Sequence, residues 1–189
     1  ASAQQQIERQ KYAKAVTPLE RALEYGTASG EAALRIRVLR SLATVQDQLG
    51  QSGPARETLA QAVALAREAQ DNDALRQTLA ELGRLQLLAN DATGAVASYE
   101  EAARLHAAAG ALVDQRRATA NLGLAQYVAG DKEASYAAYQ QALALSRQTQ
   151  DRAAEGVVLA RLGEIDSDLG RDAQALDLLP QAIVVIAET

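Results

Sequence analysis

A period of 40 residues runs through this chain and constrains its fold more than any other feature. Leucine recurs at this spacing without a slip, at Leu42, Leu82, Leu122 and Leu162. Eight residues after each leucine comes a turn residue: Gly50, Asn90, Gly130 and Gly170. Three further columns keep the same spacing: Ala55, Ala95, Ser135 and Ala175; Leu59, Tyr99, Tyr139 and Leu179; and Ala62, Ala102, Ala142 and Ala182. Coincident columns at a constant spacing are the signature of a tandem structural repeat.

Each period is predicted to form two helices, which are called below the first and the second helix of a repeat. Alanine and the straight-chain residues that dominate the composition are the best helix formers, and the chain has only three prolines. Gly50 and its equivalents suit the left-handed position that ends a helix, and Pro54 suits the first turn of the next one. Aspartates and an asparagine before the first helices can cap them: Asp71, Asn72, Asp73 and Asp151. We expect helices near 11–26, 32–49, 54–69, 73–89, 93–109, 112–129, 132–149, 152–169 and 172–188.

One helix pair cannot bury its apolar face alone, so neighbouring pairs must stack into an all-α solenoid. Small residues recur where helices approach closely, for example Gly123 against Ser135 and Ala142. Pro18 and Pro180 fall inside second helices and should kink them. We expect a single repeat domain over 1–189, with a partial repeat at 1–26 and four full repeats at 32–70, 73–110, 112–150 and 152–189.

The spacing of Leu82, Gly83, Ala95, Tyr99 and Ala102 resembles the tetratricopeptide repeat signature, and the two following periods repeat it. The period is longer than the family's usual length of about 34 residues. It is similar to the longer repeats of kinesin light chain, of Leu-Gly-Asn-type adaptors and of bacterial signalling arrays. The tyrosine that the family carries in the first helix is replaced here by Gln46, Gln86, Gln126 and Asp166. The resemblance implies a right-handed superhelix of antiparallel helix pairs that binds protein segments.

The residue inventory argues against an enzyme. The chain has no cysteine and one histidine, His106, which we expect to be solvated or partly packed at the surface. No triad or phosphate-binding glycine loop can be assembled, so no cofactor and no metal is expected. A net charge of −5 argues against a nucleic-acid partner, and no apolar run is long enough for membrane insertion. We expect a cytoplasmic location, with a periplasmic one left open.

The resemblance implies that first helices line a concave surface where ligands lie. Spacings of three and four residues then predict a peptide-binding groove with a basic side, an apolar middle and an acidic end. The candidate residues are Arg37, Arg40, Arg84, Leu87, Leu88, Arg117, Asn121, Leu124, Tyr127, Val128, Glu164 and Asp168. We also assign Asp166 to the acidic end, and Asn121 matches a ligand-contacting Asn of the longer-repeat adaptors. The alternative is that some of these side chains pack between neighbouring first helices.

Three functional interpretations follow. The first is a scaffold that binds a protein or peptide segment with an apolar anchor and an acidic flank. The second is a self-assembling module, a homo-oligomer through its terminal repeats, because Ile183, Val184, Val185 and Ile186 lack a polar capping helix. The third is a regulatory sensor domain of a larger multidomain protein.

Overall fold

The computed structural model describes residues 3–188, and these residues form nine α-helices with no strand among them. This confirms the expected all-α class. The chain divides into two compact units, Ala1–Asn90 and Asp91–Thr189. The expectation of one repeat domain over the whole chain stays a prediction.

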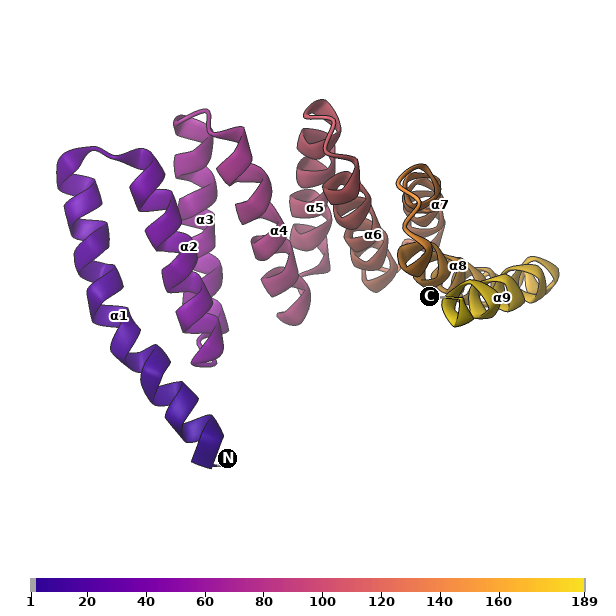
Figure 1. Cartoon of the computed structure of the whole chain (residues 1–189), viewed down its shortest axis with the longest axis horizontal. Helices are drawn as coiled ribbons and strands as arrows, with labels where there is room; N and C mark the ends of the chain where they lie inside the picture. The colour runs from indigo at the N-terminus through magenta and orange to yellow at the C-terminus, as the bar shows by residue number, and fades with distance from the viewer. Residues whose placement is uncertain (1–2, 189) are drawn as a thin grey trace. The chain divides into compact units, whose positions relative to one another are not determined.

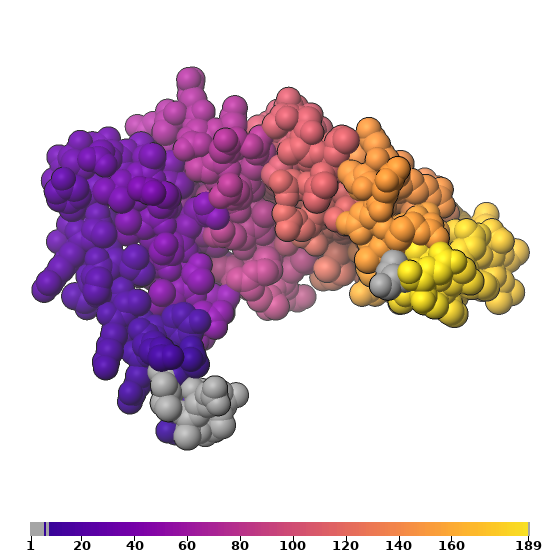
Figure 2. Space-filling view, viewed as in Figure 1, coloured from indigo at the N-terminus to yellow at the C-terminus, as the bar shows by residue number. Residues whose placement is uncertain are grey.

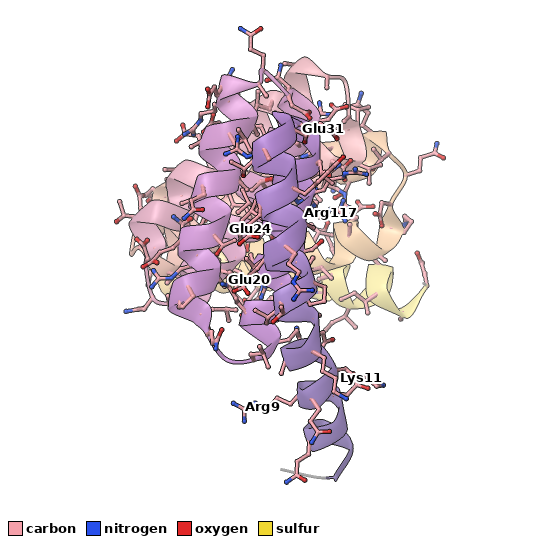
Figure 3. All side chains as sticks on the ribbon, turned by 90° about the vertical axis from the view of Figure 1, so that its left-hand side faces the viewer. Arg9, Lys11, Glu20, Glu24, Glu31 and Arg117 are labelled. Carbon is pink, nitrogen blue, oxygen red and sulfur yellow. The ribbon has the colours of Figure 1, made fainter. Side chains whose placement is uncertain are left out.

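The first unit contains four helices, in which each helix packs against the next along the chain (Figure 1). They are α1 (Ala3–Ser29), α2 (Ala32–Gln48), α3 (Ser52–Glu68) and α4 (Asn72–Leu88). α1 begins earlier than the expected 11–26, and its N-terminal turns extend past the end of α2 (Figures 1 and 2). Arg9 lies on this projecting part, where its guanidinium donates to the carbonyl of Leu49 at 3.4 Å (Figure 3).

The second unit contains five helices that also pack in chain order. They are α5 (Ala92–Ala108), α6 (Leu112–Val128), α7 (Lys132–Gln148), α8 (Arg152–Asp168) and α9 (Asp172–Ala187). Apart from α1, every helix begins and ends within about two residues of its expected bounds, because the turn residues that set those bounds recur with the period.

Left-handed residues end the helices, as the sequence predicts. Gly50 has φ 80° and Asn90 has φ 61°, and the N–H of Gln51 donates to the carbonyl of Gln46 at 2.8 Å. This bond, from the second residue beyond the cap back to the third-last helical residue, is the Schellman arrangement. The turns after second helices use the same conformation, with φ 55° at both Gln70 and Gln150.

Small residues lie where the sequence expects close helix approach. In the second unit the Ser135 hydroxyl donates to the carbonyl of Gly123 at 2.7 Å. A Cβ atom added to Gly123 would lie 2.9 Å from the ring of Tyr139, so only glycine fits there without movement. The alanine columns are buried in both units, with no exposed surface at Ala62 or Ala142. Pro18 and Pro180 lie inside α1 and α9, and both helices continue through them.

Candidate binding surface

In the first unit the predicted residues lie on the two first helices, α2 and α4. Arg37 and Arg84 are exposed, and Arg40 and Leu87 are half-buried. Leu88, in the last turn of α4, is 69% exposed. In the first unit, Arg37, Arg84 and the apolar side chain of Leu88 are therefore accessible to solvent.

Two of these arginines are held by acids on the neighbouring first helix. Arg40 on α2 donates to Glu81 at 2.5 Å and to Gln77 at 2.7 Å, both on α4. In the opposite direction, Arg84 on α4 donates to Asp47 on α2 at 2.8 Å. Charge-assisted bonds of this kind fix a guanidinium in place. A ligand carboxylate would have to share Arg40 and Arg84 with Glu81 and Asp47.

In the second unit an exposed apolar group lies on α6. Leu124 is 37% exposed, Tyr127 is 38% exposed and Val128 is 45% exposed. Asn121 is half-buried, one turn earlier on the same helix, and Arg117 lies exposed a further turn back. Arg117 bonds to Asp114 within its own helix, so it makes no link to a neighbouring element through that contact.

Tyr127 links the apolar group to the acidic residues of α8. Its hydroxyl donates to the Asp168 carboxylate at 2.5 Å, and Lys132 lies 3.3 Å from the same carboxylate. The bond to Asp168 and the negative charge of that residue raise the pKa of Tyr127 above its ordinary value. The bonds from Tyr127 and Lys132 lower the pKa of Asp168. Asp168 is therefore ionised and already accepts a hydrogen bond. Glu164 also has a donor, because it accepts from Arg161 at 2.7 Å.

The assignment of Asp166 to an exposed acidic end is wrong. Asp166 has no exposed surface, and its carboxylate lies 3.5 Å from the Arg171 guanidinium. Arg171 also donates to Glu133 at 2.6 Å and stacks 5.4 Å from the ring centroid of Tyr136. Burial, and next the charge of Asp166, raise the pKa of Tyr136. The 40-residue column explains the error, because Asp166 takes the position of Gln46, Gln86 and Gln126, which face the helix partner.

His106 is also buried, with 9% of its surface exposed, and not solvated. Its equivalents in other repeats, Ala66 and Ser146, are buried as well, so the column and not the residue type decides its environment. Among the described residues no group of three or more His, Cys, Asp or Glu side chains could hold a metal ion. Within the same residues no helix has the length and apolar character that a bilayer span requires.

Sequence reasoning missed the partners of the predicted residues. Arg40 and Glu81 are 41 residues apart, as are Tyr127 and Asp168, and Arg84 and Asp47 are 37 apart. A separation of 41 residues is one period plus one residue, and a separation of 37 residues is one period minus three residues. A search for opposite charges or donor–acceptor pairs at those offsets would have found the links between adjacent first helices.

Several known proteins share this fold. A crystal structure of BtubC (BKLC) from P. vanneervenii superposes with a TM-score of 0.82 at 19% identity, over 94% of this chain and 74% of that one. A Podosopora anserina putative kinesin light chain with nearly identical TPR-like repeats gives 0.80 at 19% identity, over 97% and 92%. A Rap protein complexed with Competence and Sporulation Factor gives 0.66 at 14% identity. That alignment covers 88% of this chain and about half, 52%, of the Rap chain.

At these identities the likenesses show the fold alone. No curated protein matches the chain. The family model for Anaphase-promoting complex subunit 5 matches residues 2–88 and 114–169, which is more than half of the sequence. The chain therefore belongs to the family described as Anaphase-promoting complex subunit 5, and its fold is a tetratricopeptide-like helical repeat.

Proposed function

We propose that this chain is a protein-binding scaffold that receives a protein or peptide segment on the exposed faces of its first helices. The observation that supports this most is the apolar group Leu124, Tyr127 and Val128, which stays exposed on α6 although the same helix buries its opposite side. Exposed apolar side chains with a polar rim mark interaction sites, and tyrosine is a frequent binding hot spot.

The chemistry of α6 indicates what such a segment would carry. Arg117, Asn121, Leu124 and Val128 follow each other at spacings of three and four residues, so they share one face of the helix. We infer that the apolar anchor of the partner packs on Leu124, Tyr127 and Val128, and that an acidic flank reaches Arg117. Asn121 would bond the partner's backbone. Arg37, Arg40, Arg84, Leu87 and Leu88 form the corresponding surface of the first unit. The Rap protein with its bound factor is a precedent for ligand binding on this fold.

The proposal is tested by affinity capture from the source lysate with two matched double variants. Arg84→Glu with Tyr127→Ala changes first helices, whereas Arg104→Glu with Tyr25→Ala makes the same substitutions at exposed positions of second helices. Circular dichroism checks that both are folded. We expect a partner that the parent and the second variant hold and the first variant loses. Equal capture by both variants would place the partner away from the first helices and overturn the proposal.

A second candidate function is self-assembly through α9. Leu176, Ile183, Val184 and Ile186 are between 49% and 73% exposed on this helix. The residues of α3 that are equivalent to Ile183 and Ile186, Val63 and Ala66, are buried. A second copy that covered α9 would give its side chains the same burial. Light scattering tests this alternative: it requires a concentration-dependent mass that Ile183→Glu abolishes and that Val113→Glu, at an exposed valine of α6, leaves intact.

A further inference from the structure

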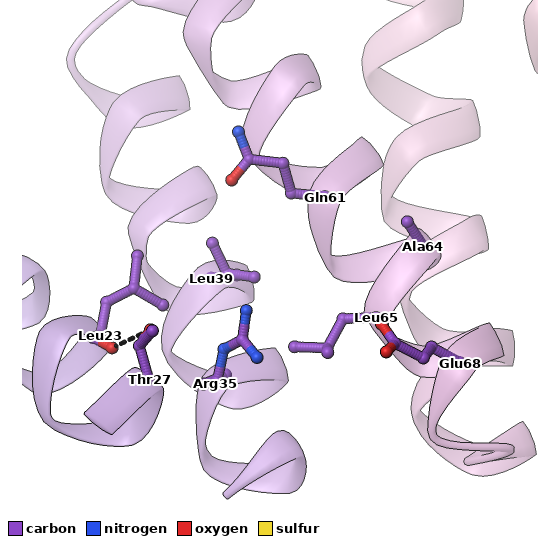
Figure 4. Close-up of a pocket in the computed structure, with 8 residues that line it drawn as sticks. All are labelled: Leu23, Thr27, Arg35, Leu39, Gln61, Ala64, Leu65 and Glu68. Carbon is purple, nitrogen blue, oxygen red and sulfur yellow. Dashed lines mark hydrogen bonds between the residues drawn. The ribbon is translucent and has the colours of Figure 1, made fainter. Parts of the chain in front are cut away.

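A cavity of about 420 Å³ lies in the first unit. It is formed by three consecutive helices: α1 contributes Leu23 and Thr27, α2 contributes Arg35 and Leu39, and α3 contributes Leu65 and Glu68 (Figure 4). Its size falls within the range of about 300–1,000 Å³ that small-ligand sites have. None of these six residues belongs to the proposed binding surface.

The lining combines three leucines with one cation, Arg35, and one anion, Glu68. Leu39 and Leu65 are buried and Leu23 is half-buried, and Figure 4 shows them beside Arg35. The Nε atom of Arg35 is buried and has no hydrogen-bond partner among the described residues. The hydroxyl of Thr27 donates to the carbonyl of Leu23 at 2.8 Å and makes no hydrogen bond with Nε of Arg35. A buried donor without an acceptor is costly, so contacts within the described residues leave the Arg35 guanidinium incompletely satisfied.

Another repeat shows how a charged side chain at the position of Arg35 is paired. Glu155 occupies the same place three periods later, and it is buried on α8. Arg147 on the preceding helix donates to it at 2.9 Å, and Arg152 donates to its other oxygen at 2.9 Å. The equivalent of Arg147 in the first unit is Thr27. Arg35 therefore faces a neutral residue where Glu155 faces a counter-ion, and the cavity occupies this region.

The stem of Arg35 is held in position by its neighbour on α1. Gly26 is buried, and a Cβ atom added to it would lie 3.0 Å from Cγ of Arg35. The guanidinium is thus supported on a packed stem, which lowers the entropy lost when it binds an anion.

We propose that this cavity binds a monocarboxylate with an aliphatic body, with the carboxylate on Arg35 and the aliphatic part on Leu23, Leu39 and Leu65. A planar carboxylate matches the guanidinium in two parallel hydrogen bonds. Glu68 at the cavity and Glu20 and Glu24 in an adjoining hollow of α1 disfavour multiply charged anions such as phosphate (Figure 3). The carboxylate can come from a free aliphatic acid or from the end of a peptide with an aliphatic last residue.

Titrations of the ¹⁵N-labelled whole chain followed by NMR test the proposal with four probes. N-acetyl-leucine stands for a peptide end, 4-methylpentanoate for a free acid, N-acetyl-leucinamide for the same body without the charge, and inorganic phosphate for a dianion. We expect at least one acid to shift the amides of α1 and α2 and to bind about tenfold or more tightly than the amide, which lacks the charged acceptor. Phosphate should bind as weakly as the amide, because it lacks the aliphatic body and its second charge is repelled by the nearby glutamates. The tighter of the two acids identifies the source.

The matched variants are Arg35→Gln and Arg37→Gln, which remove the same charge from the same helix inside and outside the cavity. Arg35→Gln should weaken binding of the acid about tenfold, and Arg37→Gln should leave it within about twofold. Failure of both acids to bind, equal binding of acid and amide, or unchanged binding by folded Arg35→Gln would overturn the proposal. The comparison of acid with amide uses the parent alone, so it decides the question even if Arg35→Gln does not fold.

Discussion

At the scale of single residues, one column of the repeat changes its polar partner from repeat to repeat. In the first unit the hydroxyl of Thr58 donates to the side-chain oxygen of Gln46 at 2.8 Å. In the second unit Gln126 occupies the place of Gln46, but Ala138 stands where Thr58 would be. The Gln126 oxygen is buried and has no hydrogen-bond partner in the part of the chain that the structure describes. The column therefore contains both a satisfied and an unsatisfied version of the same contact.

Ala138→Ser should stabilise the chain by about 0.5–1.5 kcal/mol, because it supplies the missing donor to Gln126. Thr58→Ala should destabilise the chain by about 1–3 kcal/mol, because it leaves the side-chain oxygen of Gln46 without a hydrogen-bond donor. Urea denaturation measures both free energies of unfolding. A loss of stability in Ala138→Ser would contradict the equivalence of the two positions.

The glycines give a second prediction at this scale. Alanine is the better helix former, but a Cβ atom at Gly123 would lie 2.9 Å from the buried Tyr139 ring. Gly123→Ala should thus lower the free energy of unfolding by about 1–3 kcal/mol through overpacking. Ser41→Ala, at an exposed position of α2, serves as the control and should raise it by about 0.5 kcal/mol through helix propensity alone. Thermal denaturation of the pair would show opposite shifts in Tm, and shifts of the same sign would argue against the close contact.

At the scale of helices, aspartate side chains cap the N-termini of α4, α5, α7 and α8. Two of the expected caps, Asn72 and Asp73, lie inside α4. Asp71 and Asp151 accept from the third following backbone N–H at 2.9 Å, as expected. Asp91 and Asp131 do the same for second helices, which the sequence reasoning did not foresee. α6 has Ala111 at this position, with similar backbone angles and no side-chain acceptor.

Ala111→Asp should therefore stabilise α6 by about 1 kcal/mol, the usual value of an N-cap side chain. Hydrogen exchange of the first-turn amides of α6, together with Tm, measures the gain. Ala111→Asn is a control that keeps the capping oxygen without the charge. If neither substitution slows exchange, the position is not a functional cap.

An ion pair between helices makes the stability of the second unit depend on pH. Glu155 on α8 is buried against Arg147 of α7, and the bond from Arg147 lowers the pKa of Glu155 below its ordinary value of 4.5. A lowered pKa in the folded state means that the contribution is present above about pH 4.5 and is lost as the pH falls through the folded value. Glu155→Gln should thus be less stable than the parent near neutral pH, and the difference should shrink in acid. A difference that is constant over this range would exclude the ion pair as its source.

At the scale of the whole molecule, most of the fold could be predicted from the sequence because the same columns of leucine, alanine and turn residues recur in each repeat. The columns at Leu42, Ala55 and Ala62 fixed which residues are buried, and the left-handed Gly50 and its equivalents fixed where helices end. The extension of α1 back to residue 3 could not be predicted, because no turn residue of the repeat pattern marks where this helix begins.

The candidate site could be predicted only in part. Periodicity placed Leu124, Tyr127 and Val128 on an exposed face, but the spacing used for the groove grouped the buried Asp166 with the exposed Asp168, although Asp166 belongs to the column of Gln46. The pairing of Arg40 with Glu81 and the cavity beside Arg35 depend on contacts between different repeats. A single column does not contain that information.

Site-specific photo-crosslinking in the source lysate shows whether the first helices form the binding surface. A photoreactive benzoylphenylalanine replaces Leu124 on α6 in one sample and Arg104, an exposed residue of the second helix α5, in the other. We expect a crosslinked partner from position 124 that is lost when Arg84→Glu and Tyr127→Ala are also present, and no crosslinked partner from position 104. Crosslinking of the same partner from position 104 and not from position 124 would contradict the proposed binding surface.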